Sequence, residues 1–216
     1  AATPGIGSVG HLATVELEML ADIKTVQVPY RGLSQAVNDI IAGHVDLMFD
    51  TPTTSLPLHR EGKVKIIAPE GFMDNAIAEN VLAGNAMSRR ANYMYGISLP
   101  ANDKGSVGTG LGMALSIGAP GLIPPTVIVK QTGEEMTIDG VRIQFQMAQN
   151  TEAPSEMMMY LPEKRALCLS EVAVKLMHNV YTIRGAKVRD ALVWSKYINE
   201  TLDLFPDAEV AFASHH

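Results

Sequence analysis

The apolar positions in the first 50 residues predict two helices, each followed by a strand. The first helix begins after Gly5-Ile6-Gly7-Ser8, and the β-rich run Thr25-Val26-Gln27-Val28 follows it. The second helix is predicted from Ser34 to Ala42, where Gly43 ends it, and it leads into a strand from Val45 to Phe49. The apolar face of the first helix is predicted to contain Leu12, Val15 and Met19. This alternation is typical of an open sheet with crossover helices.

Beyond residue 62 the pattern changes to short strands separated by turns, with one long helix near the end. Asp139-Gly140 lies between two β-rich runs and predicts a two-residue hairpin, because both turn positions need positive φ. The helix is predicted from Arg189 to Leu204. Its broad apolar face is predicted to contain Leu192, Trp194, Tyr197, Ile198 and Leu202. Further strands are predicted at residues 64–68, 126–129, 157–161, 166–169 and 209–213.

A change of composition near residue 62 predicts a domain boundary. The connector from Thr51 to Pro57 is rich in proline and threonine, and the charged stretch His59-Arg60-Glu61-Gly62-Lys63 follows it. We therefore predict two segments, residues 1–61 and residues 62–216. The mixed pattern of helices and strands predicts an α/β fold for the chain.

Overall composition limits the classes of function. With 47% hydrophobic and 19% charged residues among 216, the chain has the balance of an ordinary globular protein. Its formal net charge of −6 argues against a nucleic-acid partner, because such proteins usually neutralise phosphates with a basic patch. An anionic ligand would therefore need a local cluster of arginines.

Cysteine content and hydropathy exclude other classes. Cys168 is the only cysteine, so neither an intramolecular disulfide nor a zinc site of several thiolates is possible. No apolar stretch reaches about 18 uninterrupted residues. The chain also begins without a charged and then apolar leader. We expect neither a transmembrane segment nor a signal peptide in this sequence.

Three residues at the ends of predicted strands form the first candidate site. Glu152 follows a hairpin strand, Glu171 comes just after Cys168-Leu169, and His216 ends the last strand. Carboxylate and imidazole ligands suit zinc or a similar divalent ion. Spacing alone leaves open the alternative that the glutamates are solvated loop carboxylates.

The segment from Asn179 to Arg189 forms the second candidate site. Arg184 and Arg189 lie five residues apart, with Asn179 and Tyr181 just upstream. Two planar guanidinium groups and neutral donors together suit a tetrahedral oxyanion such as sulfate. The alternative is a basic face that precedes a helix.

Several long motifs follow one another beyond residue 62. They are Ala68-Pro69-Glu70-Gly71-Phe72-Met73, Glu79-Asn80-Val81-Leu82-Ala83-Gly84-Asn85-Ala86-Met87-Ser88-Arg89-Arg90, Leu122-Ile123-Pro124-Pro125-Thr126, Thr151-Glu152-Ala153-Pro154-Ser155-Glu156-Met157, Asn179-Val180-Tyr181-Thr182-Ile183-Arg184-Gly185-Ala186 and Phe212-Ala213-Ser214-His215-His216. Together they resemble the alkyl and aryl sulfatases of the metallo-β-lactamase superfamily. The resemblance implies partial αββα layers, incomplete at both ends, and a sulfuric ester hydrolase.

The same resemblance implies roles for individual residues. In that family a pair of zinc ions activates the water that cleaves an alkyl sulfate, and the full-length proteins form dimers. The implied metal ligands are Glu152, Glu171 and His216. The residues implied to hold the sulfate are Asn179, Tyr181, Arg184 and Arg189. Glu70 and Glu79 lie in equally specific motifs, but we interpret both as structural carboxylates.

One part of the sulfatase metal site has no counterpart in this chain. The family carries a loop of the form His-x-His-x-Asp-His, which supplies most of the zinc ligands. The most similar string is Gly43-His44-Val45-Asp46-Leu47, with Ala42 and Leu47 where the other histidines would fall. We therefore assign neither His44 nor Asp46 to a metal, and we predict an incomplete ligand set and inefficient turnover.

The N-terminal motifs belong to a different pattern. They are Gly5-Ile6-Gly7-Ser8-Val9-Gly10-His11-Leu12, Val28-Pro29-Tyr30-Arg31-Gly32 and Asp39-Ile40-Ile41-Ala42-Gly43-His44-Val45-Asp46-Leu47-Met48-Phe49. They resemble part of the periplasmic solute-binding proteins of tripartite tricarboxylate transporters. There Gly7-Ser8 would offer backbone N–H groups at a helix N-terminus to a carboxylate.

Two functions follow from these resemblances. The first is zinc-dependent hydrolysis of small-molecule alkyl sulfates by a chain that joins two partial families. The alternative is periplasmic binding of small carboxylates for a tripartite tricarboxylate transporter. Both families imply a periplasmic or secreted location. A third outcome is incomplete folding, because each partial segment would expose apolar surface.

Overall fold

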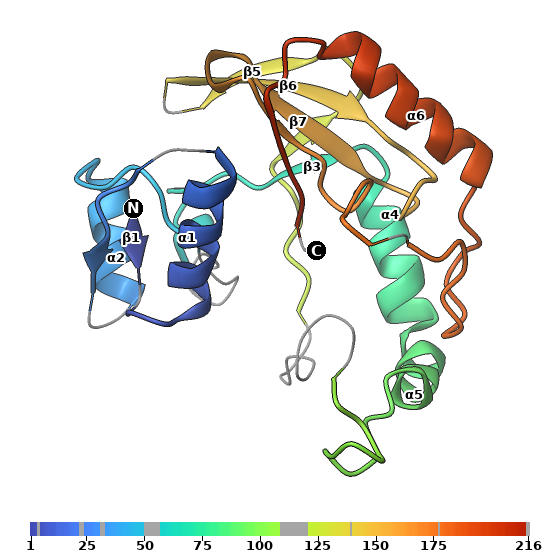
Figure 1. Ribbon diagram of the computed structural model, residues 1–216. Helices are drawn as coiled ribbons and strands as arrows, with labels where there is room; N and C mark the ends of the chain where they lie inside the picture. The colour runs from blue at the N-terminus through green and yellow to red at the C-terminus, as the bar shows by residue number, and fades with distance from the viewer. Residues whose placement is uncertain are drawn as a thin grey trace. The chain divides into compact units, whose positions relative to one another are not determined.

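The chain divides into two compact units, Ala1–Ile67 and Ala68–His216. The computed structural model describes residues 1–3, 5–21, 24–30, 33–49, 57–108, 121–138, 140–176 and 178–214. The predicted boundary between residues 61 and 62 lies shortly before the division between the units. Figure 1 shows the helices and strands of both units.

The first unit alternates strands and helices, as the sequence predicts. Its elements are β1 (Ala2–Thr3), α1 (Val9–Ala21), β2 (Val28–Pro29) and α2 (Leu33–Ile41). Strands β1 and β2 pair in parallel, and an isolated parallel bridge joins Ala2 to Met48. The predicted strand at residues 45–49 is therefore reduced to this one bridge. The predicted crossover arrangement is confirmed, although its sheet is very short.

Among its described residues, the first unit contains one hydrophobic cluster of the buried Ala2, Ala36 and Val45, with Tyr30, Ile40 and Met48 packed against them. The predicted apolar face of α1 is wrong, because Leu12 and Met19 are both exposed. Helix α1 instead buries Thr14, whose Oγ1 donates a hydrogen bond of 2.8 Å to the carbonyl oxygen of Gly10. The side chain that α1 buries at this position is thus a threonine whose hydroxyl is hydrogen-bonded within the helix.

Two sheets are present in the described part of the second unit. Strands β3 (Ile67–Pro69) and β4 (Val127–Val129) form the first. The second has five strands in the order β5-β6-β7-β8-β9. Their bounds are β5 (Glu135–Ile138), β6 (Val141–Met147), β7 (Met157–Leu161), β8 (Ala166–Cys168) and β9 (Val210–Phe212).

The five-stranded sheet is antiparallel except at one edge. Ile138 pairs with Val141 at the end of the β5–β6 hairpin, and Gly140 has a φ of 82°, which confirms the predicted turn. Asp139, the other turn residue, lies outside the described residues. Strands β8 and β9 are parallel, with Leu167 opposite Ala211. The long crossover between them contains α6 (Ala191–Leu204), as parallel neighbours require.

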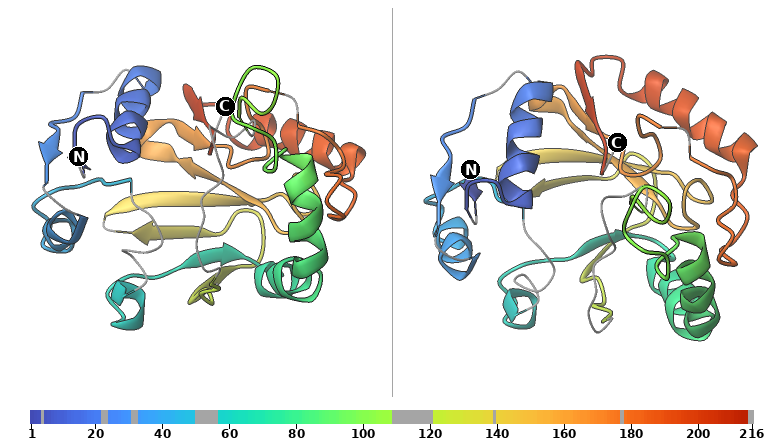
Figure 2. Two further views of the ribbon diagram at one scale, coloured as in Figure 1. Left: turned by 90° about the horizontal axis from the view of Figure 1, so that it is seen from below. Right: turned by 60° about the horizontal axis from the view of Figure 1, so that its bottom comes forward.

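Helix α6 lies along one face of this sheet in each view of Figures 1 and 2. It begins at Asp190, whose Oδ1 accepts hydrogen bonds of 3.0 Å from the backbone N–H groups of Leu192 and Val193. The buried side of α6 includes Thr201, whose Oγ1 donates 2.8 Å to Gln146 Oε1 on β6. The predicted broad apolar face is confirmed at Trp194 and Tyr197, which pack on the sheet, but it is wrong at Leu192 and Leu202, which are exposed.

Two hydrophobic clusters join α6 to the sheet. The first contains Ala148, Met158 and Val172, with Leu169, Trp194 and Tyr197 packed against it. The second contains Tyr160, Leu167 and Phe205, with the rings of Tyr160 and Phe205 4.7 Å apart. The first cluster holds the N-terminal half of α6 beside the ends of β6 and β8, and the second holds the residue that follows the helix, Phe205, against β7 and β8.

A helical segment follows β3. It consists of α4 (Phe72–Ile77), the π-helix η1 (Ala78–Leu82) and α5 (Gly84–Met94), which Figure 1 shows as a nearly continuous stretch. A short 3₁₀-helix, η2 (Pro162–Lys164), links β7 to β8. Single-turn π-helices often occur at functional sites. Among the described residues, no helix has the length and apolar character needed to cross a membrane.

Candidate metal and anion site

Glu152 lies in the loop between β6 and β7. The adjacent Thr151 is fully buried, and its Oγ1 donates 2.6 Å to the carbonyl oxygen of Ala148. Asn150 has a φ of 61°, a left-handed conformation that asparagine tolerates, and its N–H donates 3.2 Å to the carbonyl oxygen of Pro154. The loop is therefore a tight turn anchored on both sides of Glu152.

Glu171 lies in the turn that follows β8. Ser170 just before it has a φ of 51°, and its Oγ donates 2.7 Å to the carbonyl oxygen of Met157. The backbone N–H of Ser214, after β9, donates 2.9 Å to the carbonyl oxygen of Ser170. Strained backbone of this kind is retained where the surrounding contacts determine it, often at functional sites.

These two turns place Glu152 and Glu171 beside His178. One ligand atom from each of the three side chains lies within 4.8 Å of the other two. The Nε2 atom of His178 is buried, and its ring centroid is 6.0 Å from that of Trp194. His178 was not among the predicted ligands, although it directly precedes the Asn179 motif. His216, the third predicted ligand, lies outside the described residues.

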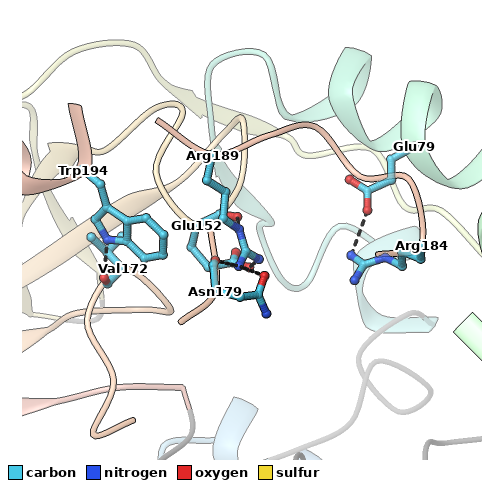
Figure 3. A network of polar contacts seen from close by, with 7 residues as sticks. All are labelled: Glu79, Glu152, Val172, Asn179, Arg184, Arg189 and Trp194. Carbon is cyan, nitrogen blue, oxygen red and sulfur yellow. Dashed lines mark hydrogen bonds and ion pairs between the residues drawn. The ribbon is translucent and has the colours of Figure 1, made fainter. Parts of the chain in front are cut away.

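Arg189 contacts both the Glu152 loop and Asn179 (Figure 3). Its Nη2 forms an ion pair with the Glu152 carboxylate, and its Nε donates 2.5 Å to the carbonyl oxygen of Glu152. Its Nη1 donates to Asn179 twice, 2.6 Å to the carbonyl oxygen and 3.3 Å to Oδ1. The side chain of Arg189 is only 9% exposed. All three nitrogens of the Arg189 guanidinium thus donate to protein groups, namely Glu152 and Asn179.

Trp194, in the first turn of α6, covers Arg189. The Arg189 guanidinium carbon lies 5.8 Å from the centre of the indole, within the range of a cation–π contact. The indole Nε1 donates 2.6 Å to the carbonyl oxygen of Val172, which fixes the ring (Figure 3). Trp194 therefore reduces the access of water to Arg189.

Arg184 contacts a different element. Its Nη2 lies 2.9 Å from Glu79 Oε1 on η1, and 26% of its side chain is exposed. The next residue, Gly185, has a φ of 97°, and a Cβ atom there would lie 2.6 Å from Arg90 Nη1. Tyr181 is 43% exposed. The predicted oxyanion-binding residues thus divide into a buried arginine, Arg189, and a more accessible group around Arg184.

The two carboxylates interpreted as structural have different surroundings. Glu79 is the ion-pair partner of Arg184. The carbonyl oxygen of Glu70 accepts hydrogen bonds of 3.3 Å from Ser155 Oγ and from Gln149 Nε2. These contacts attach the start of the α4 segment to the Glu152 loop.

Comparisons with known proteins bear on this unit. The linear primary-alkylsulfatase of Pseudomonas sp. is 54% identical over 158 residues, which cover 73% of this chain and 23% of that protein. An alkyl/aryl-sulfatase of Saccharomyces cerevisiae is 48% identical over 158 residues, covering 73% of this chain and 24% of that protein. The solved structure of the stereoselective inverting sec-alkylsulfatase from Pseudomonas sp. matches with a TM-score of 0.69 and 39% identity, covering 74% and 26% of the two chains.

Most of this chain is similar to alkylsulfatases. The predicted resemblance to these sulfatases is confirmed. The α/β class is also confirmed for the segment predicted at residues 62–216, which we call the alkylsulfatase-like segment. The chain spans about a quarter of the length of these relatives. Residues 1–83 match a second family, the tripartite tricarboxylate transporter family receptor, which confirms the N-terminal resemblance and extends it beyond residue 61.

The N-terminal string with partial similarity to the histidine-rich loop makes other contacts. His44 Nδ1 lies 3.3 Å from Asp39 Oδ1, and 71% of the histidine side chain is exposed. Tyr30 donates a hydrogen bond of 2.6 Å to the other oxygen of Asp39. In the part of the chain that the structure describes, His44 and Asp46 are not members of a three-residue cluster suited to a metal.

Glu152 and Glu156 lie in an environment that is unfavourable for negative charge. Burial raises the pKa of Glu152, and the nearby Glu171 raises it further, while Arg189 opposes both effects. Burial together with the charges of Glu152 and Glu171 raises the pKa of Glu156 to about 7. Clustered carboxylates of this kind favour a cation beside them.

The cluster fits a divalent metal ion in the alkylsulfatase-like segment. Glu152 and Glu171 provide oxygen ligands and His178 provides a nitrogen ligand, a combination that suits zinc. Three protein ligands are also the usual number at a catalytic zinc ion, which keeps a further position for water or substrate. A divalent cation would offset the charge that raises the pKa values of the carboxyl groups.

Glu156 predicts a pH dependence of stability for the metal-free chain. Its pKa rises from an ordinary value of 4.5 to about 7 on folding, so the folded chain binds more protons between these values. The free energy of unfolding should therefore decrease as pH rises through this window, and Glu156→Gln should reduce that decrease. Urea unfolding followed by the fluorescence of Trp194, the only tryptophan, measures the slope.

An exposed glutamate provides the control. The pKa of Glu163 is lowered, first by a backbone hydrogen bond and then by Arg142, so its contribution is lost only as pH falls. Glu163→Gln should leave the slope between about pH 5 and pH 8 unchanged. An equal slope in the wild type and Glu156→Gln would contradict the prediction.

Proposed function

We propose that the alkylsulfatase-like segment hydrolyses alkyl sulfate esters with the help of zinc. The observation that carries the proposal is the convergence of Glu152, Glu171 and His178 within 4.8 Å, in a segment about half identical to alkylsulfatases. The reaction adds water to the ester and yields an alcohol and hydrogen sulfate. The sequence resemblance adds a second zinc ion, His216 as a further ligand and a homodimer to this proposal.

The metal would supply the nucleophile. Zinc bound at the cluster would lower the pKa of a coordinated water and make hydroxide available near neutral pH. Glu152 and Glu171 would hold the ion from two separate turns, and His178 would contact it from the segment that precedes α6. Glu156, with a pKa of about 7, would limit the charge around these ligands by holding a proton.

The sulfate group would bind beside the cluster. Asn179 and Tyr181 are exposed and offer neutral hydrogen-bond donors, and Arg184 is partly exposed on the same segment. An arginine offsets the charge that increases on the sulfate oxygens as the ester bond breaks. Glu79 would hold the Arg184 guanidinium in place through their ion pair.

Metal content and product release test this function together. The purified full chain should retain zinc after dialysis, as measured by elemental analysis, and should release sulfate from dodecyl sulfate. Stoichiometric zinc without sulfate release would overturn the proposed reaction while leaving the metal site in place. Absence of bound zinc would overturn both.

Residues 1–83 favour a second candidate function, periplasmic binding of small carboxylates. The supporting observation is their match to the tripartite tricarboxylate transporter family receptor. In the first unit, Ser8 Oγ accepts 3.2 Å from the N–H of His11 and caps α1. Citrate should raise the melting temperature of the chain if this unit binds carboxylates, because a ligand of the folded form stabilises it. Stabilisation by a short-chain alkyl sulfate, which is not a denaturing detergent, but not by citrate would favour the sulfatase function.

A further inference from the structure

Arg189 has a role that differs from the one its motif implies. We infer that Arg189 is a positioning residue, which holds the metal ligand Glu152 and the sulfate-binding Asn179 in a fixed relation and does not itself bind the sulfate. The inference rests on the proposed function. It assigns substrate binding to Arg184 and coupling between the two sites to Arg189.

The hydrogen bonds of Arg189 support this role. Its guanidinium donates to the side chain and the carbonyl oxygen of Glu152 through Nη2 and Nε, and to both oxygens of Asn179 through Nη1. A guanidinium has five N–H donors, and these contacts use all three of its nitrogens. A sulfate at Arg189 would therefore compete with the Glu152 carboxylate for the same group.

Burial strengthens the interaction between Arg189 and Glu152. Their side chains are 9% and 11% exposed, and Trp194 covers the guanidinium. Charge-assisted hydrogen bonds are stronger where water is excluded. Removing one partner of such a pair is costly, because the other charge stays buried without compensation. Arg189 thus holds the carboxylate of Glu152 in one orientation. Residues that hydrogen-bond to metal ligands commonly have this effect.

The same clamp connects two segments distant in sequence. Glu152 belongs to the turn after β6, whereas Asn179 lies in the segment before α6, and the N–H of Asp190 adds a hydrogen bond of 3.2 Å to the carbonyl oxygen of Asn150. A displacement of Glu152 would therefore move Asn179 as well. Metal binding and sulfate binding become coupled through Arg189.

Metal affinity distinguishes positioning from substrate binding. In Arg189→Met, cobalt and zinc binding by the full chain should weaken by about 10–100-fold, the usual effect of losing a partner of a metal ligand. The visible spectrum of bound cobalt should also change, because the orientation of Glu152 changes. Arg189→Lys keeps the charge but lacks the planar fork, and should recover part of the affinity.

Two further arginines complete the comparison. Arg184→Met should keep metal affinity within about twofold, well below the loss expected at Arg189, but should abolish the thermal stabilisation by inorganic sulfate. Arg142→Met, on the surface beside Glu163, should alter neither property. Unchanged cobalt binding and spectrum in Arg189→Met, with loss of the response to sulfate, would overturn the inference and make Arg189 a sulfate ligand.

Hydrogen exchange tests the clamp without metal. Arg189→Met should increase the exchange of backbone amides in residues 150–156 and 178–188, whereas Arg184→Met should leave residues 150–156 unchanged. Equal exchange in Arg189→Met and wild type would overturn the inference. If the wild-type chain binds neither cobalt nor zinc, the proposed function fails, while the exchange result still decides the role of Arg189.

Discussion

Replacing Glu171 with glutamine should weaken zinc binding by about 100-fold or more, and sulfate release should fall in parallel. Removing a residue that only hydrogen-bonds to a metal ligand lowers the metal affinity by about 10–100-fold. Removing a ligand itself should therefore lower the affinity further. Glutamine keeps the size of the side chain but removes the charge, and it also lowers the charge repulsion on Glu152. Calorimetric titration with zinc measures the affinity, and dodecyl sulfate provides the substrate.

The charge of Glu171, not its packing, is the tested property. The free energy of unfolding of the metal-free Glu171→Gln chain should equal or exceed that of the wild type, because glutamine has the same size and removes the negative charge that raises the pKa of Glu152. Glu163→Gln changes the same residue type at an exposed position on η2 and should retain full zinc affinity. Wild-type zinc affinity in Glu171→Gln would show that this carboxylate is not a ligand.

Replacing Phe145 with alanine should lower the free energy of unfolding of the second unit by about 3–5 kcal/mol, the usual cost of removing a buried phenylalanine. Phe145 on β6 is 1% exposed and lies opposite Met159 of β7. Folded domains are stable by about 5–15 kcal/mol, so this single change would remove a large share. Urea unfolding measures the loss.

Trp194 makes the measurement specific, because the chain has two units and this tryptophan lies in the second. Its fluorescence therefore reports the unit that contains Phe145. Leu192→Ala, at an exposed position of α6, removes a similar apolar side chain and should change the free energy of unfolding by about 0.5 kcal/mol or less. A comparable loss in both variants would contradict the placement of the core.

The strands of the second unit were predictable where turn chemistry marks their ends. Strand β7 has its predicted bounds, Met157–Leu161, because Pro162 ends the β-rich run. The β5–β6 hairpin follows from the positive φ required at Gly140. Both signals are local, and neither depends on the packing of distant elements.

The faces of the helices were not predictable in the same way. On α6, Leu192 and Leu202 are exposed whereas Thr201 is buried, because a hydrogen bond to Gln146 satisfies its hydroxyl. The apolar pattern alone therefore identifies Trp194 and Tyr197 as buried-side residues, but it includes two exposed leucines and misses Thr201. Segment 72–94 also lacked a predicted helix, since its apolar residues include exposed positions such as Leu82 and Tyr93.

The sequence identified most residues of the candidate site, but not which of these residues contact one another. Motifs single out Glu152, Glu171 and the two arginines, yet spacing suggests that Arg184 and Arg189 act together. The structure separates them, because the fold directs Arg184 to Glu79 and Arg189 to Glu152. No neighbouring motif marks His178 as a ligand in the sequence. Its position beside the two glutamates follows from the turns after β6 and β8, which place Glu152 and Glu171 next to it.

The parallel pairing of β8 with β9 has a consequence for the order of folding. Strands β5 to β8 are joined by short connections, whereas β9 reaches β8 only after the whole α6 crossover, and such non-local contacts form slowly. The turn that carries Glu171 is held by two hydrogen bonds: the carbonyl oxygen of Phe212, at the end of β9, accepts from the N–H of Leu169, and the N–H of Ser214 donates to the carbonyl oxygen of Ser170. We therefore expect the Glu152 turn to form early and the two carboxylates to meet late, so that metal capture follows the docking of the last strand.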